Sequence, residues 1–193
     1  MTSDSAVIAA SIDEPSRFAP IFDRHFDAIH GYLQRRVGQD LADELAAQTF
    51  LVAFDRRPAY DLAHPDARPW LFGIATNLLR RRRRQEVRRF RAFAKTGLDP
   101  LLDPFEGLES RLDASRSGPV LAEALGRMTT EERDVLLLYA WADLSYTEIA
   151  RTLGIPVGTV RSRLARARRH VRELLGPERA INEYESIRDE EGR

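Results

Sequence analysis

Residues 145–172 carry arginines and small side chains in an order suited to binding DNA. Ser145 and Glu148 stand three residues apart, as in the capping box that begins a helix. Gly154 can adopt the positive φ that ends a helix, and Pro156 fits the first turn of another. The stretch therefore predicts two short helices around a tight turn, which is how proteins place a recognition helix in the major groove.

The second of these helices has two chemically different faces. Apolar residues at steps of three and four predict a stripe that faces a core, namely Val157, Val160, Leu164, Ala167, Val171 and Leu174. The opposite face combines small residues with arginines: Gly158, Ser162, Ala165 and Arg169, flanked by Arg161, Arg166 and Arg172. Small side chains let a helix approach a groove, and arginine can bind phosphates or the O6 and N7 atoms of guanine. A solvated basic helix is the simpler alternative, which the capped helix before it disfavours.

A second basic segment follows an apolar helical pattern near the middle of the chain. Trp70 or Leu71, with Ile74 and Leu78, predicts the buried face of a helix from about Ala67 to about Phe93. The run Arg80–Arg84 occupies every face of that helix, so the chain must leave its packed body there or meet an anionic partner. A solvated helix end is the alternative. Trp70 itself suits either a core or a stacking surface.

Composition bounds the remaining possibilities. The chain has 193 residues, 43% of them hydrophobic, and a formal net charge of zero that conceals strong local segregation. Because the local potential attracts DNA, the neutral total does not exclude a nucleic-acid ligand. The absence of cysteine excludes disulfides, thiolate metal sites and cysteine nucleophiles. No apolar run is long enough for a membrane span, and the polar start does not read as a signal peptide, so we expect a soluble, cytoplasmic protein without membrane insertion.

Catalytic motifs are absent from the sequence. It contains no P-loop, no G-x-G-x-x-G, no H-E-x-x-H and no G-x-S-x-G. His25 and His30 are five residues apart and would lie on different sides of one helix, which argues against a shared metal. We therefore expect no enzymatic activity, no cofactor and no bound metal.

The helical patterns predict an all-α protein of two small helical domains joined by a flexible linker. We expect a disordered tail at 1–14, a first domain at 15–94, a linker at 95–119, a second domain at 120–175 and an acidic tail at 176–193. In the first domain, one helix ends at Gly38, another covers about 41–54, and 55–68 form a loop. The linker has room for one helical turn around 105–112. The acidic tail could be disordered or could shield the basic helix, and disorder is the default.

The order of these parts resembles the extracytoplasmic-function sigma factors, a class of the sigma-70 family. LADELAAQTFLVAF (41–54) is similar to their polymerase-binding helix, and ARPWLFGIATNLLRRRRRQ (67–85) to their promoter-melting helix. LSYTEIARTLGIPVGTVRSRLARARRHVREL (144–174) is similar to their carboxy-terminal helix-turn-helix. The resemblance covers about residues 15–175 and rests on three motifs in the same order.

The resemblance implies a subunit that binds core RNA polymerase and promoter DNA to initiate transcription. Asn77 matches the residue that takes the flipped minus-ten base, Arg81 matches a neighbouring contact, and the loop 58–68 corresponds to the specificity loop. Arg80 and Arg84, from the same run, would add affinity for phosphates. The implied minus-thirty-five contacts are Tyr146, Thr147, Gly158, Thr159, Arg161, Ser162, Ala165, Arg166 and Arg169. The implied polymerase-binding residues are Asp43, Glu44, Gln48 and Phe50.

One motif departs from the family pattern, and two other classes of protein remain open. Where the family has glutamine and glutamate before T-F, this chain has Ala47 and Gln48, so one acidic contact to polymerase is missing. The resemblance also implies an anti-sigma factor clamped between the two domains, and we expect a monomer when no partner is bound. A helix-turn-helix operator-binding regulator, which acts without binding polymerase, is the main alternative. A helical enzyme would need a catalytic constellation that the sequence lacks.

Overall fold

The computed structural model describes residues 2–94 and 118–175. All regular secondary structure within these two ranges is helical. The elements are α1 (Asp4–Asp13), η1 (Pro15–Phe18), α2 (Ala19–Val37), α3 (Gln39–Arg56), η2 (Arg57–Ala59), α4 (Arg68–Ala94), α6 (Gly118–Arg127), α7 (Thr130–Ala140), α8 (Tyr146–Leu153) and α9 (Val157–Leu175). The predicted all-α class is confirmed. Residues 95–117 and 176–193 lie outside the description, and with them most of the predicted linker, its turn at 105–112 and the acidic tail.

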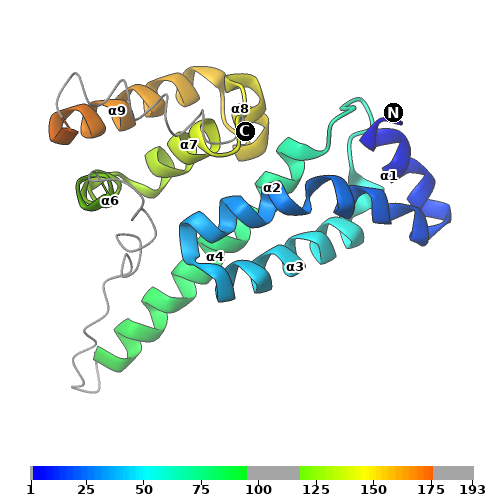
Figure 1. Ribbon diagram of the computed structural model, residues 1–193, viewed down its shortest axis with the longest axis horizontal. Coiled ribbons are helices and arrows are strands. Elements are labelled where there is room, and N and C mark those ends of the chain that lie inside the picture. Colours follow the sequence, from blue (N-terminus) through cyan, green and yellow to red (C-terminus); the bar gives the residue numbers. More distant parts are fainter. Residues whose placement is uncertain (1, 95–117, 176–193) are drawn as a thin grey trace.

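Helices α1 to α4 form an N-terminal group, and α6 to α9 form a C-terminal group (Figure 1). In the N-terminal group, α3 runs back along α2 after Gly38, whose φ of 80° is the left-handed conformation that glycine tolerates. The long helix α4 packs against both. Large side chains fill the space between them, among them Ile29, Leu33, Leu45, Leu71 and Phe72. None of the helices in the described residues combines the length and apolar composition that crossing a lipid bilayer requires.

Helix α4 is buried more widely than a single apolar stripe predicts. Leu71 and Ile74 are buried as expected, but Leu79 takes the buried position that the sequence suggested for Leu78, which is half-buried. Phe72 and Ala75 are also buried. The reason is that α4 is covered on two sides, by α2 and α3 and also by α8.

The prediction of a disordered tail at 1–14 is wrong, because residues 4–13 form helix α1. Ser3 caps the helix by accepting a hydrogen bond from the amide of Ala6, at 3.3 Å. Val7 and Ile8 are buried against the N-terminal group. An apolar segment this short shows little periodicity, so its sequence does not reveal which side is buried.

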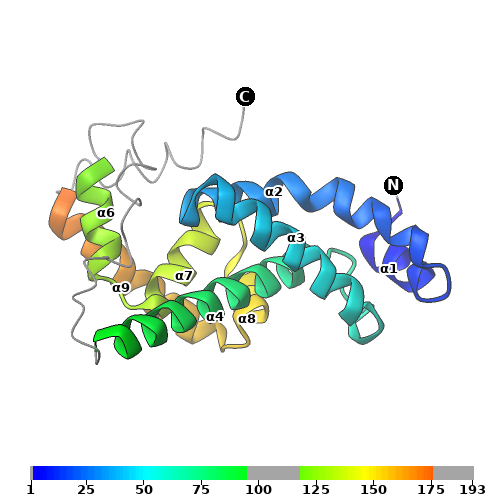
Figure 2. The ribbon, with the colours of Figure 1, turned by 90° about the horizontal axis from the view of Figure 1, so that it is seen from below.

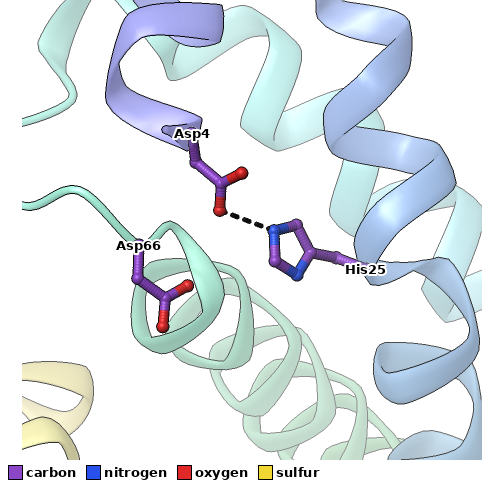
Figure 3. A group of neighbouring side chains, drawn as sticks. All are labelled: Asp4, His25 and Asp66. Atoms are coloured by element: carbon purple, nitrogen blue, oxygen red, sulfur yellow. Dashed lines mark hydrogen bonds and ion pairs between the residues drawn. The ribbon is translucent and has the colours of Figure 1, made fainter. Parts of the chain in front are cut away.

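The buried side chain of Asp4 fixes the start of α1 to its neighbours. Its Oδ1 accepts a hydrogen bond from Arg24 at 2.8 Å, and its Oδ2 lies 2.7 Å from Nε2 of His25 (Figure 3). The amide of Ala67 also donates to Oδ2, at 3.0 Å. Burial alone would raise the pKa of Asp4, but the hydrogen bonds from Ala67, Arg24 and His25 outweigh burial and lower it.

The C-terminal group follows the sequence pattern closely. The predicted capping box at Ser145–Glu148 is present before α8, and a second one, at Thr129–Glu132, begins α7. Gly154 ends α8 with a φ of 64°. The apolar stripe of α9 is buried against α6, α7 and α8, with Val160, Leu164, Ala167 and Val171 at its centre.

The two groups of helices touch along α4, and an ion-pair network joins them. Asp134 of α7 is fully buried, and its two carboxylate oxygens each lie 2.6 Å from an arginine of the N-terminal group, Arg36 of α2 and Arg80 of α4. Arg36 also donates to the hydroxyl of Tyr32 at 2.5 Å, and this hydroxyl lies 3.1 Å from Oγ1 of Thr76. A buried charge costs several kcal/mol unless it is paired, so both arginines are needed while Asp134 is covered.

Helix α8 makes the second contact between the groups, near the start of α4 (Figure 2). The hydroxyl of Thr152 donates to the carbonyl of Pro69 at 3.0 Å, and Arg151 lies 2.6 Å from Nδ1 of His64. A β-carbon at Gly73 would lie 3.0 Å from the carbonyl oxygen of Thr152. The absence of a side chain at Gly73 therefore permits this close approach.

We expect the substitution Asp134→Ala to separate the two groups of helices in solution. Without the carboxylate, the contact loses the negative charge that pairs with both Arg36 and Arg80. This loss should destabilise the closed arrangement, in which the two groups of helices touch, by about 3 kcal/mol. Small-angle X-ray scattering should show a larger radius of gyration. Glu131→Ala, which changes an exposed acid on the same helix, should leave the radius unchanged; equal radii for Asp134→Ala and the wild type would contradict the prediction.

Because Asp4 has a lowered pKa in the folded protein, its contribution to stability should depend on pH. The stabilisation is complete above its ordinary value of 3.8 and is lost as the pH falls through the lowered pKa. Asp4→Asn should therefore lower the free energy of unfolding at pH 7 by roughly 1 to 2 kcal/mol, since it weakens charged hydrogen bonds. Denaturation from pH 7 downward should show this difference disappearing below the ordinary value. The exposed Asp13→Asn on the same helix serves as the control.

Candidate nucleic-acid interface

The predicted recognition residues lie together on one exposed face of α9. Gly158, Arg161, Ser162, Ala165, Arg166 and Arg169 are exposed, and Thr159 is half-buried. This face is opposite to the buried stripe, as the spacing predicted. Within the described ranges, neither Arg161 nor Arg169 has an acidic partner, so both guanidinium groups are available to an anion or a base edge.

Arg166 differs from its neighbours because an acidic side chain already holds it. Its Nε lies 3.0 Å from Oε1 of Glu132, the capping residue of α7, and Glu132 is largely buried. His170 lies 3.9 Å from the other oxygen of this carboxylate. Glu132 of α7 therefore holds the side chain of Arg166 in place.

Tyr146 and Thr147, two of the implied minus-thirty-five contacts, lie in the first turn of α8. Thr147 is exposed, and its hydroxyl lies 3.1 Å from that of Ser145. Tyr146 is half-buried, with its ring 5.7 Å from the ring of Tyr139. Burial alone would raise the pKa of Glu148, but its bonds to the side chain and backbone of Ser145 lower it, so the cap stays charged.

A pocket of about 400 Å³ lies where the loop after η2 meets α4 and α8. The rings of Tyr60 and Trp70 form an aromatic corner, with their centroids 4.9 Å apart. Asn77 lines the same pocket with an exposed side chain. Its full lining is Arg56, Ala59, Tyr60, Asp61, His64, Asp66, Pro69, Trp70, Gly73, Ile74, Asn77, Arg151 and Thr152. Aromatic faces beside amide, carboxylate and imidazole groups can stack on a base and hydrogen-bond to its edge.

Two parts of this pocket were not identified from the sequence. Tyr60 donates its hydroxyl to the carbonyls of His64, at 2.7 Å, and Asp66, at 3.1 Å, and so closes the loop. Burial, with the charges of Asp4 and Asp66, raises its pKa to about 12. In the sequence, the only indication of a role for Tyr60 was that it is an aromatic residue in a loop with two prolines. The contribution of α8 had no local signal, because it depends on the contact between the two groups.

Trp70 has features of both roles considered for it. It is half-buried, packs against Tyr60 and lines the pocket.

The arginine run is only partly available to a ligand in this arrangement. Arg81 and Arg84 are exposed. Arg80 instead pairs with Asp134, and Arg82 lies 3.2 Å from a carboxylate oxygen of Glu44. In the closed arrangement, two arginines of the run are therefore paired with acidic residues of the protein itself.

The residues expected to bind polymerase lie on α3, and one of them, Phe50, is buried rather than exposed. Asp43, Glu44 and Gln48 are exposed, and Glu44 accepts a hydrogen bond from Gln48 at 3.1 Å. Asp43 lies 2.6 Å from Nε2 of His30. Phe50 is only 5% exposed and packs against Phe22, with ring centroids 4.9 Å apart, so it supports this surface from beneath.

Two large apolar side chains near Phe50 are exposed, Phe22 of α2 at 41% and Leu51 of α3 at 62%, and the sequence did not identify them as surface residues.

Among the described residues, Asp4, His25 and Asp66 form the group whose spacing could suit a metal ion (Figure 3). The Asp4 carboxylate already accepts bonds from Arg24 and from the amide of Ala67, and it lies within hydrogen-bond distance of His25. A cation would have to displace these bonds beside the positive charge of Arg24. The group therefore serves to attach α1 to α2 and to the start of α4.

Comparisons with known proteins identify both groups of helices. Residues 21–89 match the family model for sigma-70 region 2, and residues 120–171 match that for sigma-70 region 4. The RNA polymerase sigma factor HrpL of Pseudomonas syringae is 30% identical over 151 residues, 77% of this chain and 82% of HrpL. The ECF RNA polymerase sigma factor SigL of Mycobacterium tuberculosis is 30% identical over 171 residues, 88% of this chain and 94% of SigL.

A solved structure shows the same fold. The sigma factor RpoE of Bartonella quintana, in complex with the anti-sigma factor NepR, aligns with a TM-score of 0.63 over 82% of this chain and 96% of that chain. Its sequence identity is 21%, so this likeness concerns the fold alone. Two family models in the expected order and relatives aligned over most of their length lead to one assignment: the chain belongs to the extracytoplasmic-function sigma factors of the sigma-70 family, which direct promoter-specific initiation of transcription.

Proposed function

We propose that the pocket beside Asn77 receives the flipped base of the minus-ten element. The observation that carries this proposal is the aromatic corner of Tyr60 and Trp70 beside Asn77. Extruding a base costs a few kcal/mol, which stacking and hydrogen bonds in such a pocket can offset. Arg81 and Arg84 then contact the phosphates, and Arg80 joins them once it leaves Asp134.

The exposed face of α9 reads the minus-thirty-five element in the major groove. Arg161 and Arg169 form no ion pair with any residue that the structure describes, and Gly158, Ser162 and Ala165 keep the face flat enough for close approach. Thr147 and Tyr146 contact phosphate at the start of α8. Arg166 contributes from the position that Glu132 gives it.

The exposed side of α3 binds core RNA polymerase. Asp43, Glu44 and Gln48 supply polar contacts, while Phe22 and Leu51 add apolar area. Phe50 holds Phe22 in place. A mixed surface with an apolar centre and a charged rim is the usual composition of a protein interface.

The two groups of helices correspond to separate functional domains. Residues 15–94 bind polymerase and the minus-ten element, residues 120–175 bind the minus-thirty-five element, and the segment between them links the two. The chain acts as a non-enzymatic initiation factor in the cytoplasm, as a monomer until it meets polymerase. An anti-sigma factor would hold both domains, by analogy with the RpoE relative that was solved with NepR. An operator-binding regulator is not favoured, because the region 2 match is unnecessary for that role.

The closed arrangement must open before the minus-ten pocket is used. Arg151 and Thr152 of α8 line that pocket, and Arg80 is engaged with Asp134. Binding energy from polymerase and DNA must therefore exceed the energy of the contacts between the domains.

We expect Asn77→Ala to lower discrimination at the flipped minus-ten base by about tenfold, the effect of losing hydrogen bonds to a base edge. Transcription with core polymerase, from promoters that differ only at that base, measures the effect. Gln34→Ala removes an exposed amide from α2 and is the control. Unchanged discrimination by Asn77→Ala would argue against the proposed pocket.

Arg161→Ala should lower minus-thirty-five selectivity by about 1–3 kcal/mol at one base pair and leave affinity for core polymerase unchanged. Binding to duplexes with each base substitution in turn measures the selectivity. Arg127→Ala removes an exposed arginine from α6, away from the recognition face, and should have no such effect. A uniform loss of affinity for all duplexes would instead assign Arg161 to phosphate contact.

A further inference from the structure

Helix α1 spans the two ends of the loop 57–67, which forms one side of the pocket described above. At the far end of the loop, the amide of Asp4 donates to the carbonyl of Pro65 at 3.0 Å. The Oδ2 atom of Asp4 accepts from the amide of Ala67, also at 3.0 Å. At the near end, Nε of Arg57 donates to the carbonyl of Ser11 at 3.1 Å. One short helix thus holds the first and last residues of the loop.

The helix can hold the loop because it is itself fixed to the core. Asp4 is bonded to Arg24 and His25 of α2, and Arg24 also donates to the carbonyl of Thr2 at 3.0 Å. Ile8 is fully buried, as is Ser11, whose hydroxyl donates to the Ile8 carbonyl at 2.6 Å. Through α1, the two ends of the loop are therefore held in fixed positions relative to α2.

The anchor at Arg57 is equally well defined. Its Nη1 donates to the carbonyl of Phe54 at 2.6 Å, and its guanidinium lies 3.8 Å from the centroid of the Phe54 ring. These contacts orient Nε toward Ser11. A lysine at this position would keep the positive charge but would lack this donor geometry.

The loop transmits the position of its ends to the pocket. Tyr60 is bonded to the carbonyls of His64 and Asp66, and Asp66 directly precedes the anchored Ala67. The ring of Tyr60 then faces Trp70 across the aromatic corner. A shift of Ala67 would move Asp66 and Tyr60, and with them one wall of the pocket. Neither Asp4 nor Arg57 lines the pocket.

We propose that α1 is a brace that sets the shape of the minus-ten pocket, with Asp4 and Arg57 as positioning residues for base discrimination. This inference rests on the proposed function of the pocket. A pocket that recognises one base needs its groups held closely, since a small misplacement weakens both stacking and hydrogen bonds.

The test compares Asp4→Ala with Asp13→Ala in the full-length chain. Asp13 is an exposed acid at the other end of the same helix. Transcription with core polymerase is measured on promoters that differ only at the flipped base. Affinity for core polymerase and for a minus-thirty-five duplex is measured separately. Asp4→Ala should lower base discrimination by about tenfold, the effect of one or two lost hydrogen bonds, with both affinities unchanged. Asp13→Ala should match the wild type.

The variant Arg57→Lys releases the other end of the loop and keeps the test decisive if Asp4→Ala does not fold. It should also lower base discrimination without changing the two affinities. If both variants retain base discrimination, the proposed brace is overturned. It is also overturned if discrimination and both affinities fall together, because that result indicates general unfolding. Failure of the pocket assignment itself looks different, because the wild type and Asn77→Ala would then discriminate equally.

Discussion

The buried carboxylate of Asp134 is the interaction on which the arrangement of the two domains depends. It is covered from solvent, and it is acceptable there only because Arg36 and Arg80 each reach one of its oxygens. The bond from Arg36 to Tyr32 extends this network into the core of the N-terminal group. Because such a network depends on all of its members, the two domains are expected to close or separate as a unit.

Closure assigns two roles to several residues that would serve DNA in the open state. Arg80 pairs with Asp134 in this arrangement, so its proposed contact with phosphate requires that it leave this ion pair. Helix α8 packs against α9 and also covers one side of the pocket beside Asn77 through Arg151 and Thr152. The face of α9 that carries Arg161 and Arg169 is exposed in the same arrangement. Within this fold, contacts between the domains therefore compete with an external ligand mainly at Arg80 and at the pocket beside Asn77, the surface proposed for the minus-ten element.

The features that could be predicted from the sequence are those that short-range physics determines. Both capping boxes, the left-handed Gly154 and the stripe of α9 follow from residues within two helical turns of one another. Helix α1, the ion pairs of Arg80 and the burial of Phe50 depend on partners far away in the sequence. For example, Asp4 is a residue of ordinary polarity until folding brings Arg24 and Ala67 beside it. The resemblance drew attention to Asn77 and the loop 58–68, whereas the places of Tyr60 and α8 in the pocket that they line depend on packing between distant segments.

At Gly73, the addition of a single methyl group would disturb the contact between the domains. A β-carbon there would lie 3.0 Å from the carbonyl oxygen of Thr152, closer than the usual separation of nonbonded atoms. An alanine at this position would act as a spacer between α4 and α8 without altering any charge of the Asp134 network. The balance between closed and open forms can therefore be adjusted sterically at one position and electrostatically at another, so related chains could acquire different thresholds for activation through a single change in size.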